Sequence, residues 1–257
     1  MPDHPPAEAA LKTLLLAICL LGCATPALGA RGFNLTWGAG CWRDDPVALK
    51  AFACDANSGS STFTASFVTD FNYSEIGFLG CQLDLQSDSS VLPDWWQLSS
   101  GGACRQGALS STADFTAAPG GCTNLWRGQT PSGGFAWRTA AYPEGETGPR
   151  VPLPNRARFL GSYWVNAYVP VSKGVEYYAF SATVDYRNTV GTGACGGCAT
   201  PVTIVLNEID LTVIINPFRI TTPLSNGCLR WQAAGATPCG ATPVRNTTWG
   251  QVKGLYR

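Results

Sequence analysis

Histidine is almost missing from this chain: the 257 residues contain one, His4, close to the N-terminus. Without a histidine further along, the chain has no Ser-His-Asp or Cys-His nucleophile and no histidine general base. It also lacks a histidine ligand for zinc or copper. This one absence excludes most of the familiar enzyme mechanisms.

Charge and long apolar runs are scarce as well. Charged residues form 13% of the chain, about half the usual share, and outside residues 1–30 there are 16 Lys and Arg against 15 Asp and Glu. No basic block is present, so we expect neither nucleic acid nor an anionic lipid surface as a partner. No run after residue 30 approaches the roughly 18 apolar residues of a membrane helix, so we expect no membrane span in the mature chain.

The first 30 residues predict an export signal. An apolar run at 13–22 follows Lys12 and is too short to span a bilayer. The small residues of CATPALGA (23–30) follow it, as a cleavage site requires. We therefore expect a secreted or periplasmic protein, cleaved after position 29 or 30. The alternative is a lipid anchor through Cys23, because residues 20–23 (LLGC) resemble a lipoprotein box.

The chain is rich in sequence patterns that are typical of β-strands. Alternating or β-branched and aromatic residues predict strands over 61–70, 76–86, 157–169, 175–190 and 201–215. In the last of these the apolar positions change parity, from Ile204 and Leu206 to Ile209 and Leu211. A period of two cannot change phase without an interruption, so we predict a β-bulge at Asn207-Glu208.

These strands, separated by loops rich in Gly, Ser and Pro, predict one all-β domain over residues 31–257. The expected architecture is an antiparallel two-sheet sandwich, similar to a jelly roll. Thr248-Trp249-Gly250-Gln251 fits a capping box, which predicts a short C-terminal helix.

Nine cysteines lie outside the export signal, and in an oxidising compartment they are expected to form disulfides. An odd number leaves at least one unpaired. Spacing does not determine connectivity, but closing the nearest loops favours Cys41–Cys54, Cys104–Cys122, Cys195–Cys198 and Cys228–Cys239. Cys81, in a stretch of strand-like alternation, would be the free thiol.

The segment Cys195-Gly-Gly-Cys198 has two other interpretations. A redox CxxC opens a helix whose dipole lowers the thiol pKa, but here a strand follows. A zinc site built from Cys195, Cys198, Cys228 and Cys239 has acceptable spacing, although export favours disulfides. We expect no metal and no other cofactor.

Acid catalysis would need paired carboxylates. Glu208 and Asp210 are two residues apart on a predicted strand, and Asp84 and Asp88 form a second candidate pair. Glycosidases use such pairs across the scissile bond. A solvated polar face explains both pairs without catalysis.

Trp95 and Trp96 are the candidates for an aromatic platform that stacks on a sugar ring. Consecutive residues on a strand point to opposite faces, so at most one would face a ligand there. The alternative is that both tryptophans pack in the core or beneath a loop.

Three segments, FACDANSGSSTFTASFV (52–68), GACGGCATPVTIVLNEIDL (193–211) and TWGQVKGLYR (248–257), resemble segments of uncharacterised exported bacterial proteins. The resemblance implies a secreted β-rich domain and no assigned activity or ligand. Members of that group often carry a third cysteine where Thr203 stands, a difference that bears on the Cys195–Cys198 pairing.

Three functions are consistent with the sequence. The first is an exported, non-catalytic module that binds a glycan or another cell-surface polymer, and the second is a structural or adhesive surface protein without a small-molecule ligand. The third is a carboxylate-based glycoside hydrolase. The residues that line the exposed surface, whether aromatic, acidic or neither, distinguish the three.

Overall fold

The computed structural model describes residues 32–44, 46–98, 102–117, 121–138, 153–213, 217–220 and 226–232. Within these residues the chain is all-β, with twelve strands, three single-turn 3-10 helices and no α-helix. The elements are β1 (Gly32–Trp37), η1 (Trp42–Asp44), β2 (Leu49–Lys50), β3 (Ser60–Val68), β4 (Tyr73–Ser87), η2 (Asp94–Trp96), β5 (Leu109–Thr112), η3 (Phe115–Ala117), β6 (Thr123–Asn124), β7 (Ser132–Arg138), β8 (Arg156–Val171), β9 (Glu176–Asp185), β10 (Val202–Val213), β11 (Pro217–Ile220) and β12 (Cys228–Trp231).

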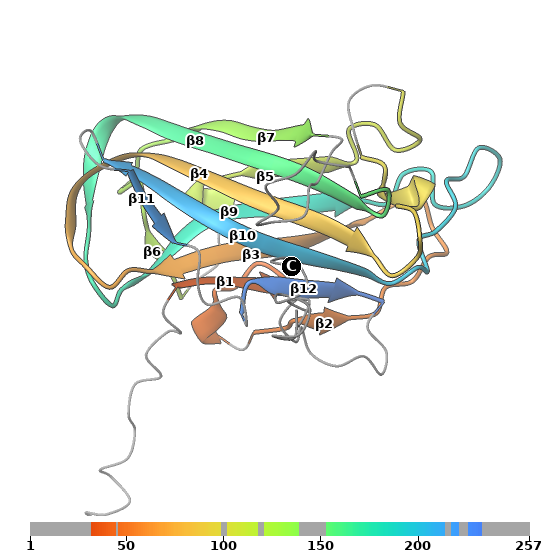
Figure 1. Cartoon of the computed structure of the whole chain (residues 1–257), viewed down its shortest axis with the longest axis horizontal. Coiled ribbons are helices and arrows are strands. Elements are labelled where there is room, and N and C mark those ends of the chain that lie inside the picture. The colour runs from red at the N-terminus through yellow and green to blue at the C-terminus, as the bar shows by residue number, and fades with distance from the viewer. Residues whose placement is uncertain are drawn as a thin grey trace, which may run out of the picture.

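The strands form two sheets (Figure 1). The smaller sheet has the order β1-β3-β9-β5, with β6 beside β9, and the larger has the order β2-β12-β10-β4-β8-β7, with β11 beside β10. The pairings between the described strands are antiparallel except for two short parallel ones, β12 with β2 and β6 with β9. The predicted all-β, two-sheet organisation is confirmed, and the two parallel pairs depart from the purely antiparallel expectation.

The apolar core lies between the sheets. Tyr163 of β8, in the large sheet, stacks on Phe180 of β9, in the small sheet, with ring centroids 6.0 Å apart. Phe135 of β7 meets the same ring edge-on at 5.2 Å. On β3 the alternate residues Phe63, Ala65 and Phe67 are buried. Contacts of this kind join both sheets into one cluster.

The predicted bulge in β10 is confirmed. Leu206 pairs with Leu83 of β4, and the next pair is Glu208 with Gln82, so Asn207 is the extra residue. Because of this extra residue, Ile204 and Leu211 are both completely buried despite their opposite parity.

The disulfides differ from the predicted pairs. The described cysteines form Cys41–Cys122, Cys54–Cys198 and Cys104–Cys195, which span 81, 144 and 91 residues. The nearest-neighbour pairs Cys41–Cys54, Cys104–Cys122 and Cys195–Cys198 are therefore wrong. Cys228 is also disulfide-bonded, while its predicted partner, Cys239, lies outside the described residues. Cys81 is free and buried.

The physical reason is that the two cysteines of the CGGC segment face different loops. Cys198 is bonded to the segment before β3, and Cys195 to the turn before β5. The same bonds rule out the alternative zinc set, because Cys195, Cys198 and Cys228 are all disulfide-bonded.

Some predictions fall outside the described residues: the export signal at 1–30 with Cys23, and the C-terminal helix that begins at Thr248. Among the described residues, no helix has the length and apolar character needed to cross a bilayer.

Candidate functional site

The two tryptophans predicted as a sugar platform are both completely buried. They lie on η2, a single 3-10 turn, where consecutive side chains are not forced to opposite faces as on a strand. Both rings pack against Trp231 of β12, with centroid distances of 4.9 Å for Trp95 and 5.2 Å for Trp96. The predicted platform is therefore wrong, because both indoles belong to the core beneath the loops.

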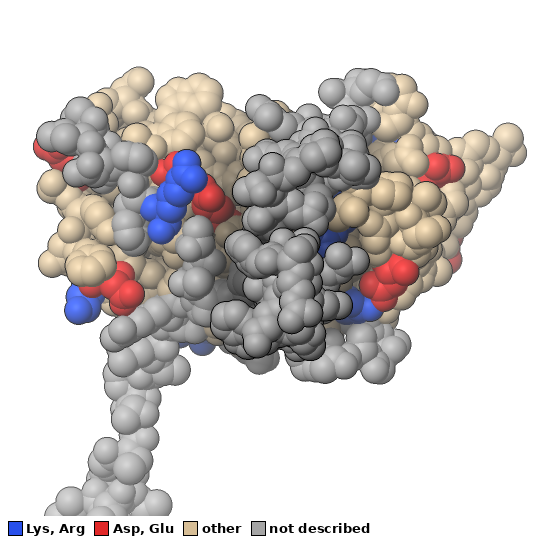
Figure 2. Space-filling view, in the orientation of Figure 1, with Lys and Arg blue, Asp and Glu red and all other residues tan. Residues whose placement is uncertain are grey.

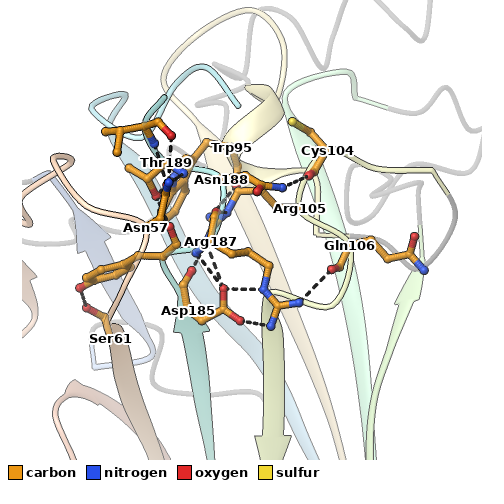
Figure 3. Close-up of polar contacts among 12 residues, drawn as sticks. Asn57, Ser61, Trp95, Cys104, Arg105, Gln106, Asp185, Arg187, Asn188 and Thr189 are labelled. Atoms are coloured by element: carbon orange, nitrogen blue, oxygen red, sulfur yellow. Dashed lines mark hydrogen bonds and ion pairs between the residues drawn. The ribbon is translucent and has the colours of Figure 1, made fainter. Parts of the chain in front are cut away.

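Arg105 lies beside these rings and is also completely buried (Figure 3). Its guanidinium carbon lies 3.5 Å from the centroid of the Trp95 ring, a cation–π contact. The guanidinium donates hydrogen bonds to the backbone oxygens of Trp95 (2.8 Å), Arg187 (2.9 Å) and Asp185. Burial lowers the pKa of Arg105 to about 10, and the nearby Asp185 carboxylate opposes that shift. One cation thus fastens η2 to the end of β9, which is a structural role.

Asn57 joins the loop before β3 to the loop after β9 (Figure 3). Its Oδ1 accepts hydrogen bonds from the backbone N–H groups of Thr189 (2.7 Å) and Val190 (2.9 Å), and its Nδ2 donates to the Val190 oxygen (2.9 Å). The strand predicted to reach residue 190 ends at Asp185, because the backbone beyond it bonds to Gly59 and Asn57 in the loop before β3.

The first predicted carboxylate pair shares an arginine. Glu208 and Asp210 lie on the outer face of β10, and both approach Nε of Arg219 on β11, at 3.5 and 3.8 Å. Two acids held by one cation form a surface ion-pair network rather than an acid facing a base.

The second predicted pair is divided between two arginines. Asp84, expected on a solvated face, is buried and accepts two hydrogen bonds of 2.7 Å from Arg158 of β8. Asp88 pairs with Arg230 of β12. Asp84 therefore has a cross-strand structural partner, in the bidentate geometry that binds a carboxylate most strongly.

One group of residues has metal-ligand types at short range. The sulfurs of Cys41 and Cys122 and a carboxylate oxygen of Glu176 lie within 4.8 Å of one another. The two sulfurs form a disulfide, and Glu176 Oε1 accepts hydrogen bonds from Trp42 N (3.1 Å) and Ser66 Oγ (2.5 Å). In this oxidised form the group offers no thiolate to a metal.

Exposed aromatic side chains lie elsewhere, on the outer face of the large sheet. Trp164 and Tyr168 of β8 are 47% and 54% exposed, and Phe78 of β4 is partly exposed. Phe78 is the cross-strand partner of Trp164. We call Phe78, Trp164 and Tyr168 the aromatic patch.

A second bulge and a glycine shape this patch. On β10 the pairing moves by one residue, from Thr212 to Val213, while on β4 it moves by two, from Phe78 to Ile76, so Gly77 is extra. The Tyr168 ring covers Gly77: a Cβ there would lie 2.6 Å from Tyr168 Cε1. Glycine at 77 thus leaves room for the Tyr168 ring against β4.

Small polar or uncharged residues border the aromatic patch. Ser132 of β7 pairs with Trp164 on one side, and Thr212 of β10 pairs with Phe78 on the other. The next row along the strands contains Gly80 and Ser162, which are cross-strand partners. In Figure 2, most of the described surface on the face in view is uncharged, and several of its basic groups lie beside acidic ones.

The aromatic patch is not among the sites predicted from the sequence, although strand parity contains the signal for it. On β8 the odd-numbered Phe159 and Tyr163 point inward and are buried. The even-numbered Leu160, Ser162 and Trp164 must then point outward. A tryptophan on the outer parity of a long strand is the signal.

No protein-family model matches this chain, and neither the curated proteins nor the solved structures show a significant match to it.

Proposed function

We propose that this protein is an exported, non-catalytic module with a sandwich-like fold that binds uncharged sugars through the aromatic patch. The observation that carries the proposal is the contrast in exposure among the aromatic rings. Trp164 and Tyr168 are about half exposed, whereas Trp95, Trp126 and Trp231 are completely buried. Neighbouring apolar side chains that stay exposed to water on adjacent strands are typical of an interaction site.

The chemistry around the patch fits a neutral sugar. The flat rings offer surfaces on which the C–H face of a pyranose can stack, and the hydroxyls of Ser132 and Thr212 on either side can bond sugar hydroxyls. Glu208 and Asp210, on the neighbouring strand β10, are already occupied by Arg219. Binding would then depend on stacking and neutral hydrogen bonds.

The pairing of each candidate acid with an arginine supports a binding role over hydrolysis. A glycosidase needs one acid that keeps its proton and one that is free to act as a base or nucleophile. Asp84, Glu208 and Asp210 each lie against a guanidinium, so none of the three is free in this sense.

Export is supported by the disulfides, which persist in oxidising compartments. We expect the mature chain to begin near Ala30 or Arg31. Intact-mass analysis of the exported protein measures this, and a diacylglycerol-modified Cys23 at the new terminus would instead establish a lipid-anchored protein.

Screening the purified mature domain on a glycan array tests the binding proposal. Trp164→Ala and Tyr168→Ala should each weaken binding of the glycan that the wild type retains on the array at least ten-fold. Phe71→Ala is the matched control, because Phe71 is a 63% exposed ring outside the aromatic patch, and it should bind like the wild type.

Two results would overturn the proposal. Silence on the array, with all variants folded, would favour a structural or adhesive surface protein. Turnover of a polysaccharide that is lost in Glu208→Gln or Asp84→Asn would favour the hydrolase.

A further inference from the structure

A groove lies at the end of the molecule where β4 ends and β8 begins, on the right in Figure 1. Its volume is about 600 Å³, and it is lined by the segment before and through η2, by the start of β8 and by the two glycines of the CGGC segment. Its lining side chains include Val91, Pro93, Asp94, Gln97 and Arg156.

The walls of this groove are fixed to one another. Leu92 N donates to Pro154 O (2.9 Å), and Trp95 N donates to Gly196 O (2.8 Å). Gly197 packs so tightly that a Cβ there would lie 2.2 Å from Pro93 Cβ. The disulfides at Cys195 and Cys198 hold the glycine wall from both sides. The groove is therefore preorganised, which reduces the entropy lost when a ligand binds.

Arg156 is the unusual residue in the groove. Its Nε is shielded from water and makes no hydrogen bond, and among the described residues no carboxylate lies within ion-pair distance of it. Arg158, two residues along the same face of β8, shows the contrast, since Asp84 occupies its Nε and Nη2. Because no described carboxylate neutralises it, the charge of Arg156 in the lining of the groove can attract an anionic ligand.

The other lining groups define the rest of the ligand. Asp94 can accept hydrogen bonds from hydroxyls, and its Oδ1 already accepts one from Gln97 Nε2 at 3.0 Å. Val91, which is 56% exposed, and Pro93 offer an apolar wall. A ligand that satisfies all three features carries a carboxylate, neighbouring hydroxyls and a C–H face.

We propose that this groove binds a sugar acid, with the carboxylate on Arg156 and a hydroxyl on Asp94. The groove is separate from the aromatic patch: Trp164 is eight residues further along β8, roughly 26 Å at the rise of an extended strand. The site therefore does not depend on the function proposed for the patch.

The test is titration of the mature protein with D-glucuronate and with D-glucose, followed by NMR or calorimetry. D-glucuronate should bind at least ten-fold more tightly than D-glucose, since the two differ in the carboxylate. Binding should also weaken as salt concentration rises.

Arg156→Gln should weaken D-glucuronate binding at least ten-fold, and Arg156→Lys should fall between it and the wild type, because lysine keeps the charge but loses the fork geometry. Arg219→Gln is the matched control: it removes the same charge from a 63% exposed arginine outside the groove and should leave binding unchanged. Trp164→Ala should also leave it unchanged, so a failure of the glycan-binding proposal would be visible separately. Any of three results would overturn the inference. They are equal binding of the two sugars, no binding of D-glucuronate, and unchanged D-glucuronate binding by an Arg156→Gln variant whose melting temperature equals that of the wild type.

Discussion

The loop end of the molecule, by which we mean η2 with Arg105 and Trp231, contains the same kinds of residue as the outer face of the large sheet. The two regions use these residues in opposite ways. At the loop end, Trp95 and Trp96 are buried against Trp231, and Arg105 is buried on top of Trp95. On the outer face, Trp164 is half exposed. An aromatic residue type therefore says little about function until the element that carries it is known.

The difference has a physical origin. The loop end has little regular backbone pairing, so disulfides, a buried cation and stacked indoles replace the hydrogen-bond ladder that stabilises a sheet. Phe78 and Trp164 of the aromatic patch lie on β4 and β8 at a point where the two strands are paired with each other. Their outward side chains contribute little to folding, which leaves them available for binding.

The largest effect on stability is expected for substitutions in the core at β10, which both regions share. Ile204→Asp would place an unpaired charge among completely buried side chains and should destabilise the fold by about 4 kcal/mol or more, enough to prevent folding. Leu211→Asp should do the same, although its parity is opposite. Thr203→Asp, beside Ile204 but on the outer face and next to Arg230, is the control. Soluble yield and denaturant unfolding measure the outcome, and a folded Ile204→Asp protein would contradict the bulged register.

The next effect separates the two regions directly. Trp231→Ala should lower the free energy of unfolding by about 3–5 kcal/mol, because the ring fills the centre of the loop-end cluster. It would also leave the Cys198 oxygen without the hydrogen bond that Trp231 Nε1 donates at 2.7 Å. Trp164→Ala should change stability by no more than about 0.5 kcal/mol. Denaturant titration under oxidising conditions compares the two, and similar losses for both would mean that the contrast between the regions is wrong.

A smaller effect concerns the buried thiol of Cys81. Burial raises the pKa of this thiol to about 12, and a hydrogen bond with the backbone of Gly161 opposes part of the shift. Above pH 9 the unfolded chain loses this proton while the folded chain keeps it, so stability should fall with rising pH by about 1.4 kcal/mol per unit up to pH 12. Tyr163, whose pKa burial also raises, contributes only at higher pH.

Comparing unfolding of the wild type and Cys81→Ala at pH 8 and pH 10 isolates the thiol, because the tyrosines are common to both proteins. The wild type should lose more stability over this interval. Alkylation of the denatured, unreduced mature protein should detect one thiol, and two or more would show that the disulfide set is incomplete.

The smallest expected effect is the response of the aromatic patch to salt. Stacking and neutral hydrogen bonds are not screened, so glycan affinity at the patch should change less than about two-fold across the salt range that weakens the groove. Array binding repeated at low and high salt measures this. A steep salt dependence would indicate that a charged ligand binds there.

Much of the fold could be predicted from the sequence because a strand has a simple period. The parity change between Leu206 and Ile209 requires a bulge wherever both segments face the same core, and the bulge is at Asn207. Such local patterns do not depend on what lies opposite in space.

Connectivity and the site could not be predicted in the same way. Cys54 and Cys198 are brought together by the pairing of β3 with β9 and of β10 with β12, none of which is local in sequence. The burial of Trp95 and Trp96 depends on η2, a turn with no periodic signature. Arg156 and Arg158 are equivalent in the sequence pattern, and only the three-dimensional structure shows that Arg158 has a carboxylate partner while Arg156 Nε has none.

The crossed disulfides also have a consequence for the order of events during maturation. In the export that we propose, Cys41, Cys54 and Cys104 emerge well before Cys195 and Cys198, to which two of them must bond. Until then their nearest available partners are one another, and bonds formed early must later be exchanged. The protein should therefore depend on a disulfide isomerase in its cell of origin, and its yield in a foreign host should follow the supply of that catalyst more closely than the supply of oxidant.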